Sequence, residues 1–289
     1  MRDAARGLAN RLGILPALRA AKWRIRVATG HVRQQRRFRW AARPALPIFG
    51  NAMAKSGSHI LAQFLAGLES IAPLVFTDHH PLRTLDEAGR RRPTSDVLAA
   101  LDRLGPGDIG WGYLPDDQAY LDWAGRCNVI GFFTYRDPRD KIVSHVLYAM
   151  DIHPGHAMAD YYRKLESMEV RVDATIRGVP GLVEDVRTTY ESYLGWLDHA
   201  QFMPLRFEDL IEQQDQTVGR MLEYMQARGV ALAIEREAAI RLLLRAMAPD
   251  HSPTFRAGRT GDWRGHFTAA NQQTFDEVAG DLLERLGYA

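Results

Sequence analysis

The chain has 289 residues, of which 46% are hydrophobic and 25% are charged, with a formal net charge of +2 and a single cysteine. This composition predicts one domain whose core is large enough to fold without disulfides or a structural metal. A single cysteine also excludes an intrachain disulfide. No apolar run reaches the roughly 18 residues of a membrane-spanning helix, and the first residues lack the apolar stretch of a secretory signal. We therefore expect a cytoplasmic protein.

The charge is distributed unevenly along the chain. Residues 1–43 contain twelve Lys or Arg against Asp3 alone, or +11, which leaves 25 basic and 34 acidic residues, or −9, in residues 44–289. We expect a basic amphipathic arm over residues 1–43 and a folded domain over residues 44–289. Such an arm suits peripheral contact with the inner membrane surface or packing on its own acidic domain, and both alternatives stay open. The acidic domain argues against nucleic-acid binding.

The domain begins with a predicted strand over residues 46–53, a tight turn, and a helix over residues 58–69. Backbone N–H groups at a helix N-terminus have no intrahelical partner, so a phosphate or sulfate is stabilised there. The ATP and GTP P-loop has glycine before lysine, whereas here lysine comes first, so this turn is not a Walker A loop. A plain surface turn is the alternative. The turn reads Lys55-Ser56-Gly57-Ser58.

Strands and helices alternate through the first half of the domain, which predicts an α/β fold with a parallel sheet covered by helices. A further strand in the second half completes a five-stranded core. The predicted strands are 46–53, 73–77, 108–113, 129–135 and 202–207. The predicted helices are 58–69, 95–104, 117–126, 138–150, 156–170, 182–200, 208–228, 234–247 and 269–286.

Two later segments add anion-binding side chains. Arg136 follows the carboxyl end of a predicted strand, and Ser144 lies two turns into the next helix, so both can face one phosphate. Residues 255–268 form a basic loop punctuated by glycines, and its arginines are placed to fold over an anion as a lid.

These three segments, with residues 205–210 between the second and the third, resemble the PAPS-dependent sulfotransferases of the cytosolic and Golgi superfamily, in a bacterial-like form. The resemblance covers residues 46–288 and follows the family's order and spacing. It implies a P-loop-like three-layer sandwich with a central, mostly parallel five-stranded sheet. It also implies that residues 44–289 are a sulfotransferase domain, with PAPS as co-substrate, PAP as product and no metal.

The resemblance assigns a binding role to each matching residue. The first turn holds the 5′-phosphosulfate, the strand–helix pair holds the 3′-phosphate, and the late loop closes over that phosphate. His59 stands where the family has a second Thr or Ser, and Phe207 stands where many members have a tyrosine near the adenine. The implied binding residues are Lys55, Ser56, Gly57, Ser58, His59, Arg136, Ser144, Phe207, Arg256, Ala257 and Gly258.

The implied catalytic residues are Lys55, which neutralises charge on the leaving phosphate, and a base that takes the acceptor's proton. The family often has His-Leu-Pro where this chain has tyrosine before Leu-Pro, so Tyr113 replaces the base histidine. A tyrosine with an ordinary pKa of about 10 is a weak base unless a cation lowers that pKa. His79 and His80 are the other candidates, and a solvated histidine pair in a turn is the alternative for them.

We expect transfer of a sulfuryl group from PAPS to a hydroxyl or amine acceptor, such as a saccharide, a glycolipid, a lipid alcohol or a small phenol. Residues 78–96 and 151–181 are the irregular segments expected to wall the acceptor pocket. A non-catalytic, membrane-associated protein that binds PAPS or PAP is the main alternative, because the base histidine is replaced. A nucleotide kinase fits less well, since the glycine-lysine order and a magnesium site are both missing from the sequence pattern.

Overall fold

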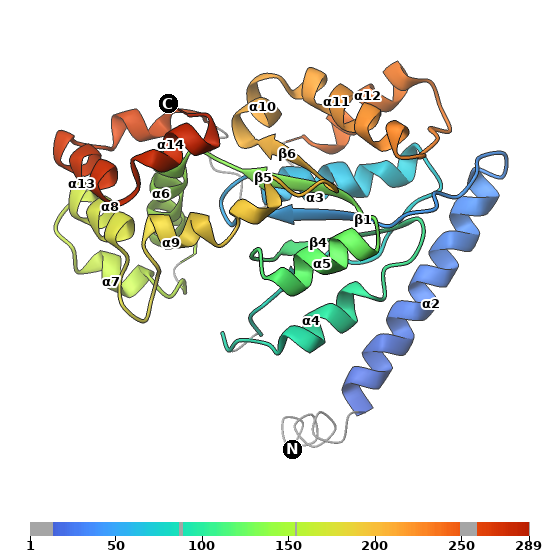
Figure 1. Ribbon diagram of the computed structural model, residues 1–289, viewed down its shortest axis with the longest axis horizontal. Coiled ribbons are helices and arrows are strands. Elements are labelled where there is room, and N and C mark those ends of the chain that lie inside the picture. Colours follow the sequence, from blue (N-terminus) through green and yellow to red (C-terminus); the bar gives the residue numbers. More distant parts are fainter. Residues whose placement is uncertain (1–13, 87–88, 154, 249–258, 289) are drawn as a thin grey trace.

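The computed structural model describes residues 14–86, 89–153, 155–248 and 259–288 (Figure 1). Its sheet runs in the order β2-β4-β1-β5-β6, with β3 paired to β4, and all pairs are parallel. The predicted five-stranded, mostly parallel core is confirmed, and the two-residue β3 is a sixth strand that the sequence pattern did not predict. The strands are β1 (Ile48–Ala52), β2 (Val75–Phe76), β3 (Leu82–Arg83), β4 (Asp108–Tyr113), β5 (Ile130–Tyr135) and β6 (Phe202–Arg206).

Helices cover both faces of this sheet (Figure 1). The alternation of side chains along β5 shows why: Phe132 packs in the core cluster of one face, and Phe133 packs in the cluster of the other. Residues from α3 (Ser58–Gly67), α11 (Gln214–Ala227) and α12 (Arg236–Ala246) complete the first cluster. Residues from α4 (Thr94–Leu101) and α5 (Gln118–Arg126) are in the second. The α/β fold class is therefore confirmed.

A second group of helices lies beyond the end of β5 (Figure 1). It begins with α6, which continues into a π-helical turn, η2. Several helices predicted as continuous are divided. Ser167 accepts the Val170 N–H and so starts a new helix within 156–170, while within 182–200 a helix begins only after the Asp185 cap and ends at Glu191. The elements of this group are α6 (Pro138–Leu147), η2 (Tyr148–Ile152), α7 (Ala159–Arg163), α8 (Met168–Arg177), α9 (Val186–Glu191), η3 (Leu194–Trp196), η5 (Asp262–Gly265), α13 (Ala269–Ala279) and α14 (Asp281–Leu286). The helix α10 (Phe207–Glu212) follows β6 and lies beside α11 instead (Figure 1).

The described part of the N-terminal arm is a helix, α2 (Ile14–Arg37), which packs on the edge of the sheet. His31 Nε2 lies 2.6 Å from Asp108 Oδ1 at the start of β4, and Gly30 faces Val75 of β2. Arg43 donates to the carbonyl of Pro106 at 2.8 Å. One face of the arm therefore contacts the domain. Among the described helices, none has the length and apolar character needed to cross a bilayer.

The position of β1 in the sheet determines where the functional segments meet. β1 lies between β4 and β5 and is parallel to both, so the carboxyl ends of all three strands are neighbours at one edge. The turn with Lys55 follows β1, Tyr113 ends β4, and Arg136 follows β5. Ligands of open α/β sheets bind at this edge.

Candidate functional site

The turn between β1 and α3 has a backbone conformation that suits anion binding. Lys55 has a φ of 68° and Gly57, the N-cap of α3, has a φ of 87°. A Cβ atom at Gly57 would lie 2.8 Å from the Phe207 ring, so both conformation and space require glycine. Within the described ranges, no side chain caps the N-terminus of α3 by a hydrogen bond. The first N–H groups of α3 are therefore suited to hold an anion.

A cavity of about 880 Å³ opens beside this turn. It brings together most of the binding residues expected from the sequence, although they come from four separate elements. Ser56 is fully buried, and its Oγ has no hydrogen-bond partner in the part of the chain that the structure describes. Arg256, Ala257 and Gly258 lie outside the described residues. The expected residues that line the cavity are Lys55, Gly57, Ser58, His59, Tyr113, Arg136, Ser144 and Phe207.

Positive charge in the turn comes from Lys55, whose Nζ lies 3.7 Å from the centroid of the Tyr148 ring. His59, in the first turn of α3, contributes a neutral imidazole: burial, and then the charge of Lys55, lower its pKa. A neutral His59 avoids adding a second repelling cation beside Lys55.

Arg136 is another cation that lines the cavity, and its side chain is 9% exposed. Its guanidinium lies 4.2 Å from the centroid of the Phe207 ring, and Nη2 donates to the Arg259 carbonyl at 2.7 Å. Nε is buried without a hydrogen-bond partner among the described residues. An arginine held in this way, close to Gly57 through Phe207, is preorganised for a phosphate.

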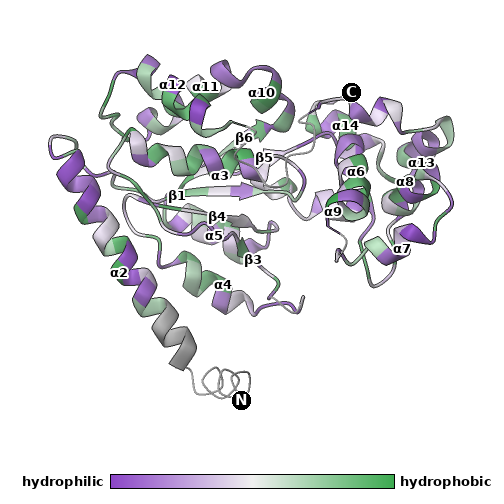
Figure 2. Cartoon of the chain, turned by 180° about the vertical axis from the view of Figure 1, so that it is seen from behind, coloured by the Kyte–Doolittle hydropathy of each residue, from purple (hydrophilic) through white to green (hydrophobic). Residues whose placement is uncertain are grey.

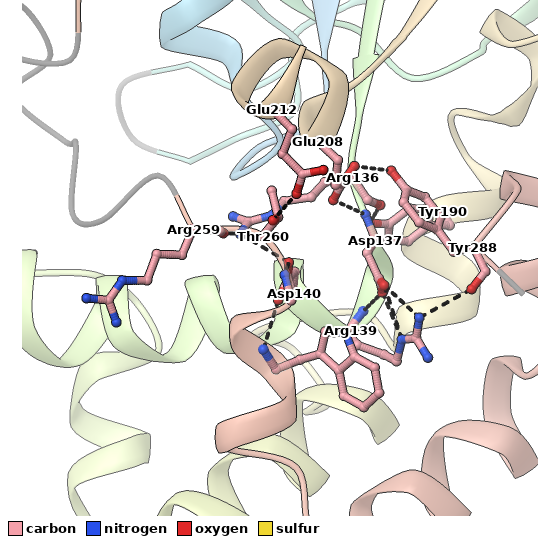
Figure 3. A network of polar contacts seen from close by, with 12 residues as sticks. Arg136, Asp137, Arg139, Asp140, Tyr190, Glu208, Glu212, Arg259, Thr260 and Tyr288 are labelled. Carbon is pink, nitrogen blue, oxygen red and sulfur yellow. Dashed lines mark hydrogen bonds and ion pairs between the residues drawn. The ribbon is translucent and has the colours of Figure 1, made fainter. Parts of the chain in front are cut away.

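Asp140 positions Arg136 and the C-terminal loop, and the sequence analysis missed it (Figure 3). It is 1% exposed, and its Oδ2 lies 3.5 Å from Arg136 Nη2. The same carboxylate accepts the backbone N–H of Gly261 at 2.7 Å and that of Trp263 at 2.9 Å. The described start of the late loop therefore lies beside Arg136. The spacing of four residues between Arg136 and Asp140 was the available sequence signal.

Two further contacts support the strand–helix junction (Figure 3). The Tyr190 hydroxyl donates to the carbonyl of Arg136 at 2.7 Å. Asp137 caps α6 by accepting the Arg139 N–H at 2.9 Å. Glu208, which accepts the hydroxyl hydrogen of Tyr288, is half-buried next to them, and burial raises its pKa. Buried and half-buried polar contacts thus hold the junction on several sides.

The three residues expected to supply the base are placed differently. Tyr113 lines the cavity, but its hydroxyl donates to Ser58 Oγ at 2.8 Å, and burial raises its pKa despite the nearby Arg83. Its phenol therefore stays protonated at neutral pH. His79 and His80 are exposed, and neither belongs to the described residues that line the cavity. The structure therefore does not bring the histidine pair to Lys55.

The cavity wall instead contains three histidines that the sequence analysis did not single out: His145 on α6, and His153 and His156 after η2. The rings of His145 and His156 are 5.0 Å apart. The Nδ1 of His156 accepts the backbone N–H of Met158 at 3.2 Å, so in the neutral form its proton is on Nε2. The Nε2 of His145 has no hydrogen-bond partner among the described residues.

Both irregular segments expected to wall the acceptor pocket contribute to the cavity. Residues 83–86 and 89 come from the first, and Ile152, His153 and His156 come from the second. Across the described ranges, no cluster of three or more His, Cys, Asp or Glu side chains is arranged to hold a metal ion.

Comparisons with known proteins give one consistent family. A family model described as "Sulfotransferase domain" matches residues 122–287. Sulfotransferase 2A6 of Mus musculus is 23% identical over 170 residues, which are 52% of this chain and 55% of the relative. The match thus spans about half the length of that curated relative.

Three solved structures share the fold. Mouse sulfotransferase SULT7A1 complexed with PAP has a TM-score of 0.57 and 14% identity, over 84% of this chain and 85% of the other. Retinol dehydratase with androsterone and the inactive cofactor PAP has a TM-score of 0.54 and 18% identity, over 85% of this chain and 82% of the other. Retinol dehydratase with retinol and PAP has a TM-score of 0.50 and 17% identity, over 85% of this chain and 83% of the other. At these identities the likeness is one of fold.

We predict that Asp140→Asn lowers the free energy of unfolding by about 2–4 kcal/mol, because it removes a buried carboxylate that pairs with Arg136 and accepts two N–H groups. Urea denaturation measures this. The matched control is Asp209→Asn, whose 3.4 Å pair with the half-exposed Arg220 predicts a loss below about 1 kcal/mol. Equal losses in the two variants would contradict the role of Asp140.

A second prediction concerns His145, whose pKa is lowered to about 3 by burial and, to a lesser extent, by nearby Lys141, His156 and Lys55. Between its ordinary pKa of 6.5 and pH 3, the unfolded state takes up a proton that the folded state does not. Stability is therefore lost as pH falls through this window, by about 1.4 kcal/mol per pH unit.

Glutamine does not titrate, so in the variant His145→Gln the unfolded state takes up no proton at this position. The free energy of unfolding of this variant should therefore fall less steeply than that of the unsubstituted protein between about pH 6 and pH 4. Urea titrations at a series of pH values give the slopes. His80→Gln, at an exposed position, is the control and should leave the slope as it was. An unchanged slope in His145→Gln would show that His145 is protonated in the folded state.

Proposed function

The chain belongs to the sulfotransferase domain family, and we propose that it moves a sulfuryl group from PAPS to a hydroxyl or amine acceptor. The observation that carries this proposal is that the uncapped α3 N-terminus, Lys55, Arg136 and Ser144 line one cavity. Anion-binding groups on two separate segments that line one cavity suit a donor with two separate phosphate-bearing positions. Solved relatives of the same fold have PAP bound.

The residues of this cavity fit the chemistry of the donor. PAPS supplies the sulfuryl group when it is bound. The N–H groups of the turn around Gly57 would hold the 5′-phosphosulfate, and the Lys55 ammonium would neutralise charge that develops on the leaving phosphate. The buried Ser56 Oγ, without a partner among the described residues, lies in the same turn. Catalysis would then rest on positioning and electrostatic stabilisation.

Arg136 and Ser144 would hold the 3′-phosphate. The guanidinium forms charge-assisted hydrogen bonds, and Asp140 keeps it in place. Phe207, between Arg136 and Gly57, offers an aromatic surface for the adenine. Arg256, Ala257 and Gly258 would close over the same phosphate, since the described loop begins beside Arg136 at Arg259.

The acceptor proton needs a base within the cavity. Tyr113 is a donor to Ser58 with a raised pKa, and the Nδ1 of His156 already accepts a hydrogen bond. We therefore propose that the base is one of the other histidines of the cavity: His59, His145 and His153. These three histidines replace Tyr113, His79 and His80 as the proposed candidates for the base.

The acceptor is proposed to be a small alcohol or phenol, or the end of a saccharide or lipid. The volume of about 880 Å³ lies within the range of small-molecule sites. Two solved relatives were crystallised with androsterone and with retinol. A non-catalytic PAPS- or PAP-binding protein is the second candidate function, favoured by the protonated phenol of Tyr113.

Calorimetric binding of PAP, with AMP as the reference nucleotide, tests the donor site. We expect Arg136→Ala to weaken PAP binding by about 10- to 100-fold, the size of a lost charge-assisted hydrogen bond, and to leave AMP binding unchanged. Arg126→Ala is the matched control, because that arginine is exposed on α5. Equal weakening for PAP and AMP, or no preference for PAP in the unsubstituted protein, would refute the assignment.

Transfer from PAPS to androsterone, retinol or 2-naphthol tests the base. We expect one of His59→Asn, His145→Asn and His153→Asn to lower turnover by about 100-fold or more and to remove the acidic limb of the pH profile. The controls are His79→Asn and His80→Asn, at exposed positions outside the cavity. Full activity in all three cavity variants would place the base elsewhere. PAP binding without transfer to any acceptor would favour the non-catalytic alternative.

A further inference from the structure

The helix α2 has two faces with different surroundings. Its inner face is made of Val27, Gly30, Gln34 and Phe38, which follow one another at helical spacing and are all buried. This face packs on the sheet edge, where His31 pairs with Asp108. The inner face therefore fixes α2 on the domain.

The outer face exposes large apolar side chains. Ile25 is 67% exposed, Val32 is 53% exposed, and Trp40, just after the helix, is 72% exposed. Ile25 and Val32 are seven residues apart, so they lie on the same side, opposite the buried stripe. Half of the six exposed large hydrophobic side chains in the described part of the chain lie within these 16 residues. The outer face is therefore an unusually apolar part of the surface.

Arginines surround these apolar side chains. Hydrophilic residues (purple) and hydrophobic residues (green) therefore alternate along α2 in Figure 2. Arg33, Arg36 and Arg39 are exposed, and none of them forms an ion pair with another described residue. The sequence from Ile14 to Arg43 contains no Asp or Glu. The outer face thus combines uncompensated positive charge with apolar anchors.

We propose that the outer face of α2 binds an anionic lipid bilayer, with the helix lying along the surface. Apolar side chains enter the boundary between headgroups and acyl chains, tryptophan prefers this boundary, and arginines pair with anionic lipid. Because the inner face fastens α2 to β2 and β4, this contact places the whole domain at the membrane.

The chemistry of this face favours lipid over nucleic acid. A phosphate backbone would use the arginines but would leave Ile25, Val32 and Trp40 exposed to water. The proposal goes beyond sulfuryl transfer and does not depend on it.

Co-sedimentation of the full chain with vesicles tests the proposal. One set of vesicles is phosphatidylcholine, and the other is an equimolar mixture with phosphatidylglycerol. We expect binding only to the mixed vesicles, weakening as salt is added. The variant Arg33→Gln/Arg36→Gln/Arg39→Gln should lose about 100-fold in partitioning. The variant Ile25→Ser/Val32→Ser/Trp40→Ser should lose at least about tenfold.

Matched controls make the same substitutions elsewhere on the surface. Arg103→Gln/Arg241→Gln/Arg245→Gln and Val170→Ser/Leu182→Ser change exposed side chains outside α2, and both should bind vesicles as the unsubstituted protein does. Circular dichroism checks that each variant is folded.

Three outcomes would overturn the proposal. The first is equal partitioning of the α2 variants and their controls. The second is absence of vesicle binding together with arginine-dependent binding of duplex DNA, which would identify a nucleic-acid surface. The third is absence of vesicle binding together with self-association that the apolar variant abolishes, which would identify a contact between two copies of the chain.

Discussion

The buried carboxylate of Asp140 is the interaction on which the arrangement of the cavity depends. It accepts two backbone N–H groups of the C-terminal loop and pairs with Arg136, so one side chain connects α6, the loop and the guanidinium. Without the carboxylate, the N–H groups of Gly261 and Trp263 would lose their acceptor, and the buried Arg136 would lose its paired charge. Arg136 is consequently held over Phe207, next to the turn at Gly57, in a position that needs little reorganisation to receive an anion.

The charge of the cavity at neutral pH depends on which of its titratable side chains are uncharged. Burial lowers the pKa of His59 and of His145, and burial raises the pKa of Tyr113, so none of the three is charged at neutral pH. Lys55 and Arg136 are the cations beside the Gly57 turn and Phe207, and Arg83 and Arg259 also line the cavity. Lys55 and Arg136 lie on turns that follow adjacent strands, an arrangement that suits the two charged ends of the proposed bisphosphate-type donor.

Local patterns predicted most elements, and the main errors are helices that the structure divides. The strand β4 and the start of α6 agree with the prediction because a strand run and an N-terminal proline are strong local signals. Long stretches such as 156–170 and 182–200 were predicted as single helices but are divided. The Ser167 cap starts α8 inside the first range, where it outweighs the helical periodicity. In the second range α9 begins after the Asp185 cap and ends at Glu191, before η3.

The sequence by itself determined the turn from Lys55 to Ser58 and the junction from Arg136 to Ser144, because each depends on residues close together in the chain. Only the tertiary structure decided which of them meet. The order β4-β1-β5 brings the two segments and Tyr113 to one edge, while it leaves His79 and His80 outside the cavity. Long-range packing also formed the cavity wall that contains His145 and His153, and it determined which face of α2 is buried and which is exposed. Such contacts join residues far apart in sequence, and local pattern carries no information about them.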